Sequence, residues 1–381
     1  MKIFLFQFYS PYACPDYDEI GNLLRHKGHK VSVTHMTQER KLRVIDDRSE
    51  TDFDIFPRKI IDTGYFKFIF RRFAFILFML RVRRIIRKLN PDIFMIAPAE
   101  LMYLSLLPLL MPKTIKFVFD IRQLGLTPGN SLKSTLRNVR LKFNYVFLSR
   151  YLYDHTCFAF EDAAIKILGT EWKEKKASVM EVGVNQIFFN IQHTQIIRND
   201  RKLELIYVGS LSKLRKLEVI MDAVNLISIH SGEFHITFIG YDPDNYYSTY
   251  VNKNNLKKFI TILEPVPYKE IPSIVSNYDV AIAYVPDHPD WLYQPTLKVK
   301  EYCAMGIPVI ASENGPNRAF VKENKNGVFF SNSAEDICRA VVLLLNNKDL
   351  LNKLSEFSQN NRHGSTWDDS VLNYEKLFHE L

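Results

Sequence analysis

The segment QPTLKVKEYCAMGIPVIAS, residues 294 to 312, predicts a short helix that runs into a buried strand. Pro295 suits the first helical turn, where its missing N–H removes no hydrogen bond. Gly306 suits the left-handed position just past the helix end, and Pro308 prevents continuation of the helix. The apolar run at 309–311 is typical of a buried strand. The segment is therefore one helix-to-strand step of an α/β pattern.

Two charged residues of this helix lie on the same face. Lys298 and Glu301 are three positions apart, and such residues are neighbours on a helix surface. A cation near a helix N-terminus, with a carboxylate one turn deeper, is suited to a sugar-linked diphosphate. The phosphates would bind Lys298 and backbone N–H groups, and hydroxyls would donate to Glu301. The alternative is an ordinary amphipathic helix with a solvated ion pair, which spacing alone favours.

Apolar strand-like runs and helical patterns alternate along almost the whole chain, which predicts an α/β fold with parallel sheets. The pattern is interrupted by a polar, unpatterned stretch at 190–203. We therefore expect two doubly wound Rossmann-like domains that face each other across a cleft, at 1–190 and 204–362. Strands are expected at 3–6, 31–34, 93–96, 115–119, 156–159 and 177–180, and at 205–208, 236–239, 259–263, 280–284, 309–311 and 328–330.

The composition is that of a folded protein, with 47% hydrophobic and 24% charged residues among 381. The four cysteines are scattered without metal-ligand spacing, which indicates reduced thiols and a cytoplasmic protein. The apolar start of the chain is too short for a signal peptide and is expected to be the first strand. Since no apolar run reaches about 18 residues, we predict no membrane span.

The net charge of +8 is concentrated in the first half. Residues 65–88 combine eight Lys or Arg residues with six Phe residues in a Leu, Ile and Met background. This composition favours an anionic membrane surface over nucleic acid. A core helix with a solvated basic edge is the alternative. A second basic stretch contains Lys133, Arg137, Arg140, Lys142 and Arg150.

Several catalytic motifs are missing from the sequence. It contains no Walker loop, no GxGxxG after the first strand, no HExxH and no GxSxG. A phosphate-binding pattern remains at 205–216, where a strand opens into a small polar turn and a basic helix start. Gly209 would allow close backbone approach, and Arg215 or Lys216 could reach a diphosphate. The loop around Val266 could offer backbone groups to a nucleobase, or be an ordinary connection.

In this order the motifs resemble those of GT-B glycosyltransferases, in particular glycosyltransferase family 4. The resemblance is strong after residue 205 and loose before 150. It rests on YVGSL…RKLE…DA at 207–223, YDVAI at 278–282, KVKEYCAMGIPV at 298–309, NGVFF at 326–330, TWD at 366–368, EVGVN at 181–185 and LRHKGHKV at 24–31.

The resemblance implies roles for individual residues. Lys298 and Arg215, with Lys216 as a further candidate, would hold the donor diphosphate, and Glu301 would bind the ribose. Gly209 would let the backbone approach the phosphates, and the helix at 366–381 would pack back on the first domain.

The chain departs from the family pattern at residues 10–14, which replace a glycine-rich loop, at Ser210, which replaces an arginine, and at Tyr293. Many family members carry a glutamate eight residues before the ribose-binding one, where this chain has Tyr293. The sugar contacts would then fall to Gln294 and Thr296, among others. In the first domain, Asp120 and Arg122 end a predicted strand. They would orient the acceptor hydroxyl and assist the diphosphate, or form a structural ion pair.

The expected function is therefore that of a retaining glycosyltransferase that needs no metal or other cofactor, since family members of this pattern usually need none. It would use a nucleotide sugar and a lipid-linked or other membrane-associated acceptor, in polysaccharide or glycoconjugate biosynthesis. Residues 65–88 would dock it on the inner face of the cell membrane, and no nucleic-acid partner is expected. The alternative is a non-catalytic protein of the same fold that binds a nucleotide sugar or a partner, which Tyr293 keeps open.

Overall fold

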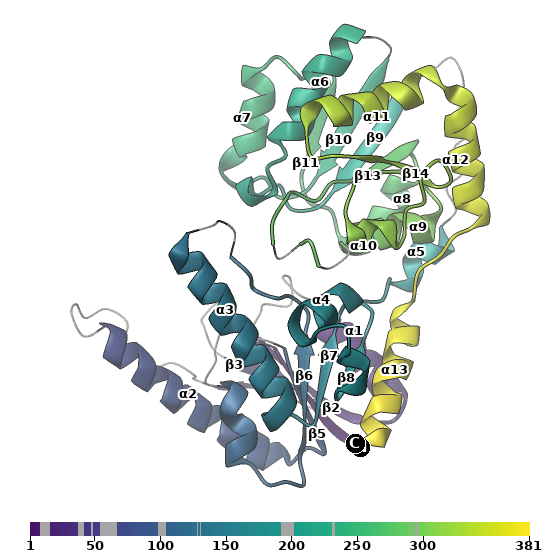
Figure 1. Ribbon diagram of the computed structural model, residues 1–381. Helices are drawn as coiled ribbons and strands as arrows, with labels where there is room; N and C mark the ends of the chain where they lie inside the picture. Colours follow the sequence, from purple (N-terminus) through teal and green to yellow (C-terminus); the bar gives the residue numbers. More distant parts are fainter. Residues whose placement is uncertain are drawn as a thin grey trace. The chain divides into compact units, whose positions relative to one another are not determined.

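The chain forms two compact units in a computed structural model (Figure 1). The first unit comprises residues 1–183 and 367–381, and the second comprises 184–366. The structure describes residues 1–7, 16–36, 42–46, 49–53, 67–97, 104–127, 129, 131–191, 202–230, 233–289, 291–293 and 296–381.

The first unit is built on an eight-stranded sheet in the order β4-β3-β2-β1-β5-β6-β7-β8. Six of its strands run parallel, whereas β3 pairs antiparallel with β2 and β4. The β3–β4 hairpin was not expected, because both strands are four residues long and β4 (ETDF) is polar. The strands are β1 Lys2–Phe6, β2 Lys30–Met36, β3 Leu42–Ile45, β4 Glu50–Phe53, β5 Ile93–Ile96, β6 Lys116–Ile121, β7 His155–Phe158 and β8 Ala177–Val179.

A helix from the far end of the chain completes the core of this unit. Trp367, Val371 and Tyr374 of α13 are buried among apolar side chains of β1, β2 and β5. The helices are α1 Asp16–His26, α2 Lys67–Leu89, α3 Leu132–Phe147, α4 Glu161–Leu168 and α13 Trp367–Glu380, with a π turn at Leu148–Leu152 and 3-10 turns at Leu104–Leu110 and Trp172–Glu174.

Helix α2 packs an apolar face into the first unit. Phe78, Val82 and Ile86 are buried. Phe78 therefore belongs to the core, and the expectation that it faces lipid is wrong. Arg84 and Lys88 are exposed. Residues 65 and 66 and the side chains of 67–75 lie outside the described residues. Among the residues described, no helix has the length and apolar character that a membrane span requires.

The second unit contains a six-stranded parallel sheet in the order β11-β10-β9-β12-β13-β14. Its strands are β9 Leu203–Val208, β10 Phe234–Ile239, β11 Ile260–Leu263, β12 Val280–Ala283, β13 Val309–Ser312 and β14 Gly327–Phe330. Its helices are α5 Gln186–Asn190, α6 Glu218–His230, α7 Tyr246–Lys253, α8 Ile271–Val275, α9 Leu297–Met305, α10 Gly315–Arg318, α11 Ala334–Asn346 and α12 Lys348–Asn360, with 3-10 turns at Lys213–Arg215, Pro243–Asn245 and Tyr268–Glu270.

The unit boundaries differ from the expected ones. Residues 184–190 belong to the second unit, because Val184 and Phe188 are buried in its core. The amide of Val184 also donates to the carbonyl of Ser365 at 2.9 Å, so both ends of this unit lie together. The polar stretch expected as the linker falls mostly on residues 192–201, outside the described part of the chain.

Candidate functional site

Helix α9 and strand β13 follow the limits that the sequence predicts. The helix begins after Thr296 and ends at Gly306, which has a left-handed φ of 73°. A Cβ at Gly306 would lie 3.0 Å from the carbonyl oxygen of Ser358, so a larger residue would be both strained and crowded. Gln294 and Pro295 lie outside the described residues. Since α9 ends just before β13 begins, its N-terminus points toward the carboxyl ends of the parallel strands, where doubly wound folds bind ligands.

Lys298 reaches the end of strand β9. Its Nζ lies 3.6 Å from the centroid of the Tyr207 ring, a cation–π contact. A Cβ on Gly209 would come within 3.0 Å of the same Nζ, so the glycine leaves room for this cation. Residues expected to bind the donor from two separate segments are thus brought together.

A second cation lies nearby. Arg215 stacks on Trp291, with 4.4 Å between the guanidinium carbon and the ring centroid. Burial, together with the charge of Arg215, lowers the pKa of Lys298 well below its usual range. Two cations that repel each other in a partly desolvated place would be stabilised by a bound anion. Lys216 is exposed, and its left-handed backbone is held by a hydrogen bond from the Tyr284 hydroxyl to its carbonyl, at 3.3 Å.

Glu301 lies one turn deeper in α9 and is only 6% exposed. The hydroxyl of Tyr268 donates to its Oε1 at 2.6 Å. Burial raises the pKa of Glu301 to about 7, although the hydrogen bond from Tyr268 and the charge of Lys298 act in the opposite direction. Val266 is half-buried two residues before Tyr268, so its loop leads directly to this carboxyl group.

Among the buried hydroxyl groups without a hydrogen-bond partner in the described part of the chain, two lie at this site. They belong to Thr296, which precedes α9, and to Tyr207, which lies under Lys298. Thr296 does not cap α9 with its side chain, which leaves the first N–H groups of the helix without that partner. Helix N–H groups and an unsatisfied hydroxyl next to two cations are well suited to bind a phosphate.

The loop that carries Gly209 is held rigidly. The amide of Gly209 donates to the carbonyl of Ile239 at 2.9 Å. A Cβ at Gly240 would clash with the carbonyl oxygen of Gly209, so the ends of β9 and β10 pack backbone against backbone. The hydroxyl of Tyr302 accepts from the amide of Val208 at 3.1 Å, which ties α9 to β9. The loop and the helix therefore form one preorganised site.

Asp120 and Arg122 lie in the first unit, where the geometry favours the structural alternative. Asp120 is 0% exposed and accepts hydrogen bonds from the hydroxyls of Tyr17 at 2.9 Å and Tyr374 at 3.2 Å. Arg122 donates to Asp120 at 2.8 Å, to Asp16 at 3.0 Å and to Tyr374 at 2.9 Å. A carboxylate enclosed in this way joins β6 to α1 and α13 and is not placed to contact an acceptor.

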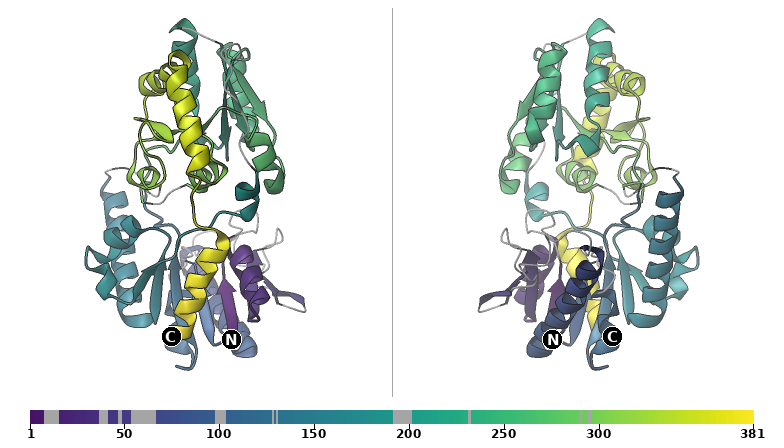
Figure 2. Two further views of the ribbon diagram at one scale, coloured as in Figure 1. Left: turned by 90° about the vertical axis from the view of Figure 1, so that its right-hand side faces the viewer. Right: turned by 90° about the vertical axis from the view of Figure 1, so that its left-hand side faces the viewer.

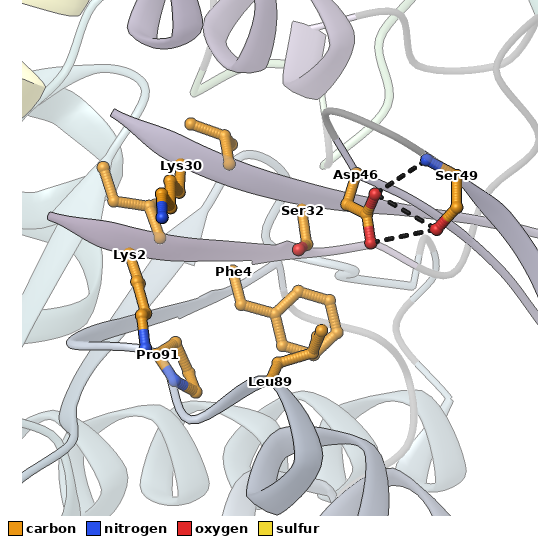
Figure 3. Close-up of a pocket in the computed structure, with 10 residues that line it drawn as sticks. Lys2, Phe4, Lys30, Ser32, Asp46, Ser49, Leu89 and Pro91 are labelled. Carbon is orange, nitrogen blue, oxygen red and sulfur yellow. Dashed lines mark hydrogen bonds between the residues drawn. The ribbon is translucent and has the colours of Figure 1, made fainter. Parts of the chain in front are cut away.

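A hollow of the first unit lies away from these residues (Figure 3). Lys2 and Lys30 line it at the first residues of β1 and β2, and Asp46 beside it is bonded to Ser49. It therefore opens at the amino ends of parallel strands, the edge opposite to the one at which such sheets bind ligands.

Four aromatic residues of the site were not identified from the sequence. Tyr207 and Trp291 each contact one cation, Tyr268 bonds the carboxylate, and Tyr302 joins helix to strand. Tyr207 and Tyr302 fall inside the quoted motifs, but their roles depend on tertiary contacts.

Known proteins resemble this chain in sequence and in fold. The family model described as glycosyl transferases group 1 matches residues 188–363. Spore coat protein SA from Bacillus subtilis (strain 168) is 28% identical over 131 residues, which is 32% of this chain and 33% of that protein. The chain is thus matched to only about a third of the length of this curated relative.

Similar solved structures cover the whole chain. A glycosyltransferase from Rickettsia africae ESF-5 has a TM-score of 0.70 and 15% identity over 100% of this chain and 98% of its own. Sucrose-phosphate synthase from Thermosynechococcus elongatus has a TM-score of 0.68 and 12% identity, over 100% and 98%. Anabaena HepE in complex with UDP has a TM-score of 0.67 and 11% identity, over 100% of both chains.

These likenesses confirm the expected fold class, with two parallel-sheet Rossmann-like domains as in GT-B structures. The matched residues 188–363 include Gly209, Arg215, Lys298 and Glu301. The match to the group 1 glycosyl transferases thus lies within the second unit, and the likeness to GT-B structures extends over the whole chain.

Proposed function

We propose that this protein transfers a sugar from a nucleotide-sugar donor to a membrane-associated acceptor. The observation that carries the proposal is the convergence of Lys298, Arg215 and the N-terminus of α9, with Glu301 one turn deeper. Cations and helix N–H groups are suited to a diphosphate, and a carboxylate at this depth is suited to ribose hydroxyls.

Most of the proposed donor contacts come from residues of α9 and of the loop after β9. Lys298, Arg215 and the backbone at Gly209 would hold the diphosphate, with Lys216 close to its outer side. The buried hydroxyl of Thr296 would donate to a phosphate or a sugar oxygen. The remaining proposed contacts are Glu301 to the ribose, Gln294 to the sugar and the backbone at Val266 to the base.

The proposed reaction retains the anomeric configuration and uses no metal. The acceptor hydroxyl attacks the sugar C1 from the face that the diphosphate leaves. A new C1–O bond forms as the C1–O bond to phosphate breaks, and the hydroxyl proton passes to a phosphate oxygen. The positive charges of Lys298 and Arg215 and the dipole of α9 stabilise the departing diphosphate.

The proposed acceptor is a lipid-linked glycan or a glycolipid of a polysaccharide or glycoconjugate pathway, used at the inner face of the cell membrane. Its support is the excess of cations in the first unit, of which Arg84, Arg87 and Lys88 on α2 are exposed. Anionic headgroups attract such residues by about 1 kcal/mol each near the membrane surface.

The test is an assay with a panel of nucleotide sugars and lipid-linked acceptors, with the product anomer determined by NMR and with and without a chelator. We expect Lys298→Ala and Glu301→Ala each to lower kcat/KM by about 100-fold, as loss of one charged transition-state contact does. Lys353→Ala, an exposed lysine of α12, is the matched control.

Two results would contradict the proposal. Full transfer by both site variants would show that the donor binds elsewhere. Tight nucleotide binding without turnover on any acceptor would instead indicate the non-catalytic alternative.

A further inference from the structure

The outer face of α3 carries a stripe of apolar side chains in solvent. Leu132 is 76% exposed and Phe143 is 67% exposed, although both are large hydrophobic residues. The stripe spans the whole helix and the π turn after it, and Figure 2 shows α3 at an outer edge of the first unit. The α3 stripe consists of Leu132, Leu136, Val139, Phe143, Phe147 and Tyr151.

The stripe is not the face by which α3 packs on its own unit. At about 100° per residue, its members up to Phe147 fall within an arc of about 80°. The opposite side holds the buried residues Ser134, Tyr145 and Leu148. Tyr145 anchors that side through its hydroxyl, which donates to the carbonyl of Leu124 at 3.2 Å. Helix α3 therefore has a buried inner face and an apolar outer face, whereas a helix on a protein surface ordinarily has a polar outer face.

The aromatic members of the stripe form a continuous ridge. The Phe143 and Phe147 rings stack with their centroids 6.4 Å apart, and the Phe147 and Tyr151 centroids are 5.4 Å apart. Leu109 is exposed on the neighbouring 3-10 turn, which packs on both α2 and the π turn. Together the α3 stripe and Leu109 form an exposed apolar surface, as in helices that insert into the surface of a membrane.

The charge around the stripe is positive throughout. Residues 131–151 contain no acidic residue, and each of their five cations is exposed. On the helical projection Arg140 and Lys142 lie on opposite sides of the stripe. The five cations are Lys133, Arg137, Arg140, Lys142 and Arg150.

We propose that α3 docks this protein on the surface of an anionic lipid bilayer. The α3 stripe enters the boundary between headgroups and acyl chains, and the flanking cations meet the lipid phosphates. A second copy of the chain would fit less well, because its α3 would bring five like charges against these five. The inference deepens the proposed function and rests on it, since it assigns the membrane contact to 131–151 in place of 65–88.

The experiment is sedimentation of the full chain with vesicles of phosphatidylcholine, alone or mixed with phosphatidylglycerol. Binding is expected only to the anionic vesicles and should weaken as salt is added. The double variant Val139→Asp/Phe143→Asp should lose at least about tenfold in the partition coefficient. Arg140→Glu/Lys142→Glu should lose binding to a similar degree.

Controls come from exposed apolar residues elsewhere. Ile229→Asp on α6, at a position 77% exposed, and Leu372→Asp on α13 should bind as the unchanged protein does. A Phe143→Trp variant should show fluorescence quenching by brominated lipid acyl chains. Circular dichroism and nucleotide binding of each variant report that it is folded.

Other outcomes separate the two proposals. Unchanged vesicle binding by the stripe variant, or no quenching of the indole fluorescence introduced by Phe143→Trp, would overturn the docking role of α3. The docking role would also be overturned if the unchanged protein were a dimer that binds no lipid and if the stripe variant were a monomer. If the protein bound lipid through α3 but bound no nucleotide, the docking role of α3 would stand and the proposed sugar transfer would be contradicted.

Discussion

Lys298 has surroundings that suit a phosphate ligand better than a structural role. Its amino group lies on the Tyr207 ring, close enough to Arg215 for that charge to help lower its pKa. Glu301, four positions from the helix start, has a pKa raised by burial to about 7. Both residues are therefore in a charge state that a bound ligand would change.

This arrangement predicts how nucleotide-sugar binding depends on pH. Ribose hydroxyls need the carboxylate form of Glu301, so the affinity should fall by up to about tenfold per pH unit below its pKa of about 7. Affinity should fall again at high pH, because Lys298, whose pKa is lowered, loses its proton before an ordinary lysine does. Calorimetric titration of a nucleotide sugar across pH 5 to 10 measures both limbs.

Glu301→Gln supplies the control for this prediction. This variant keeps the size of the side chain but no longer titrates. The fall in affinity at low pH should therefore disappear, while the fall at high pH remains. An acidic limb that persists in Glu301→Gln would assign it to another group.

At the scale of elements, α13 is held by a buried polar cluster as well as by apolar packing. The Tyr374 hydroxyl donates to Asp120 and accepts from Arg122, which in turn bonds Asp16 of α1. A buried charge that loses one partner is costly, so this cluster fixes α13 in a single orientation on β6.

The cluster predicts a stability effect without an effect on the donor site. Tyr374→Phe should lower the free energy of unfolding by about 1–3 kcal/mol, because it leaves buried polar groups of Asp120 and Arg122 with one partner fewer. Urea denaturation measures this loss, and the dissociation constant for nucleotide should stay unchanged. A loss of turnover with stability intact would instead support the catalytic role expected for Asp120 from the sequence.

Much of this architecture could be predicted from the sequence, because its signals are local. Apolar runs between helical patterns indicated the parallel strands, and Gly306 and Pro308 marked the end of α9. The β3–β4 hairpin was missed because its strands are short and β4 is polar. Lys298 and Glu301 could be proposed as a pair because they share one helix, whereas Tyr374, which helps to enclose Asp120, lies 254 positions away in the chain.

At the scale of the whole molecule, the two units differ in how the chain builds them. The second unit is one continuous segment, 184–366, whereas the first needs 1–183 and 367–381. Each unit has buried clusters of its own, such as the one around β9 and α6 and the one around β1 and α13.

This difference predicts that residues 184–366 fold alone and bind nucleotide with the affinity of the whole chain, within about threefold, because all the proposed donor contacts lie in them. Residues 1–183 alone should lack a cooperative unfolding transition, since Trp367, Val371 and Tyr374 are missing from their core. Calorimetry of the two fragments checks both statements. A fragment 184–366 that folds but binds no nucleotide would place essential donor contacts in the first unit.

The position of α13 also bears on the order of events at the ribosome. Domains usually fold as units from the N-terminus onward during synthesis. Here the segment that completes the first unit is made after the entire second unit. The half that is translated first is therefore the half that matures last, and its unfinished core must avoid aggregation until residues 367–381 have emerged.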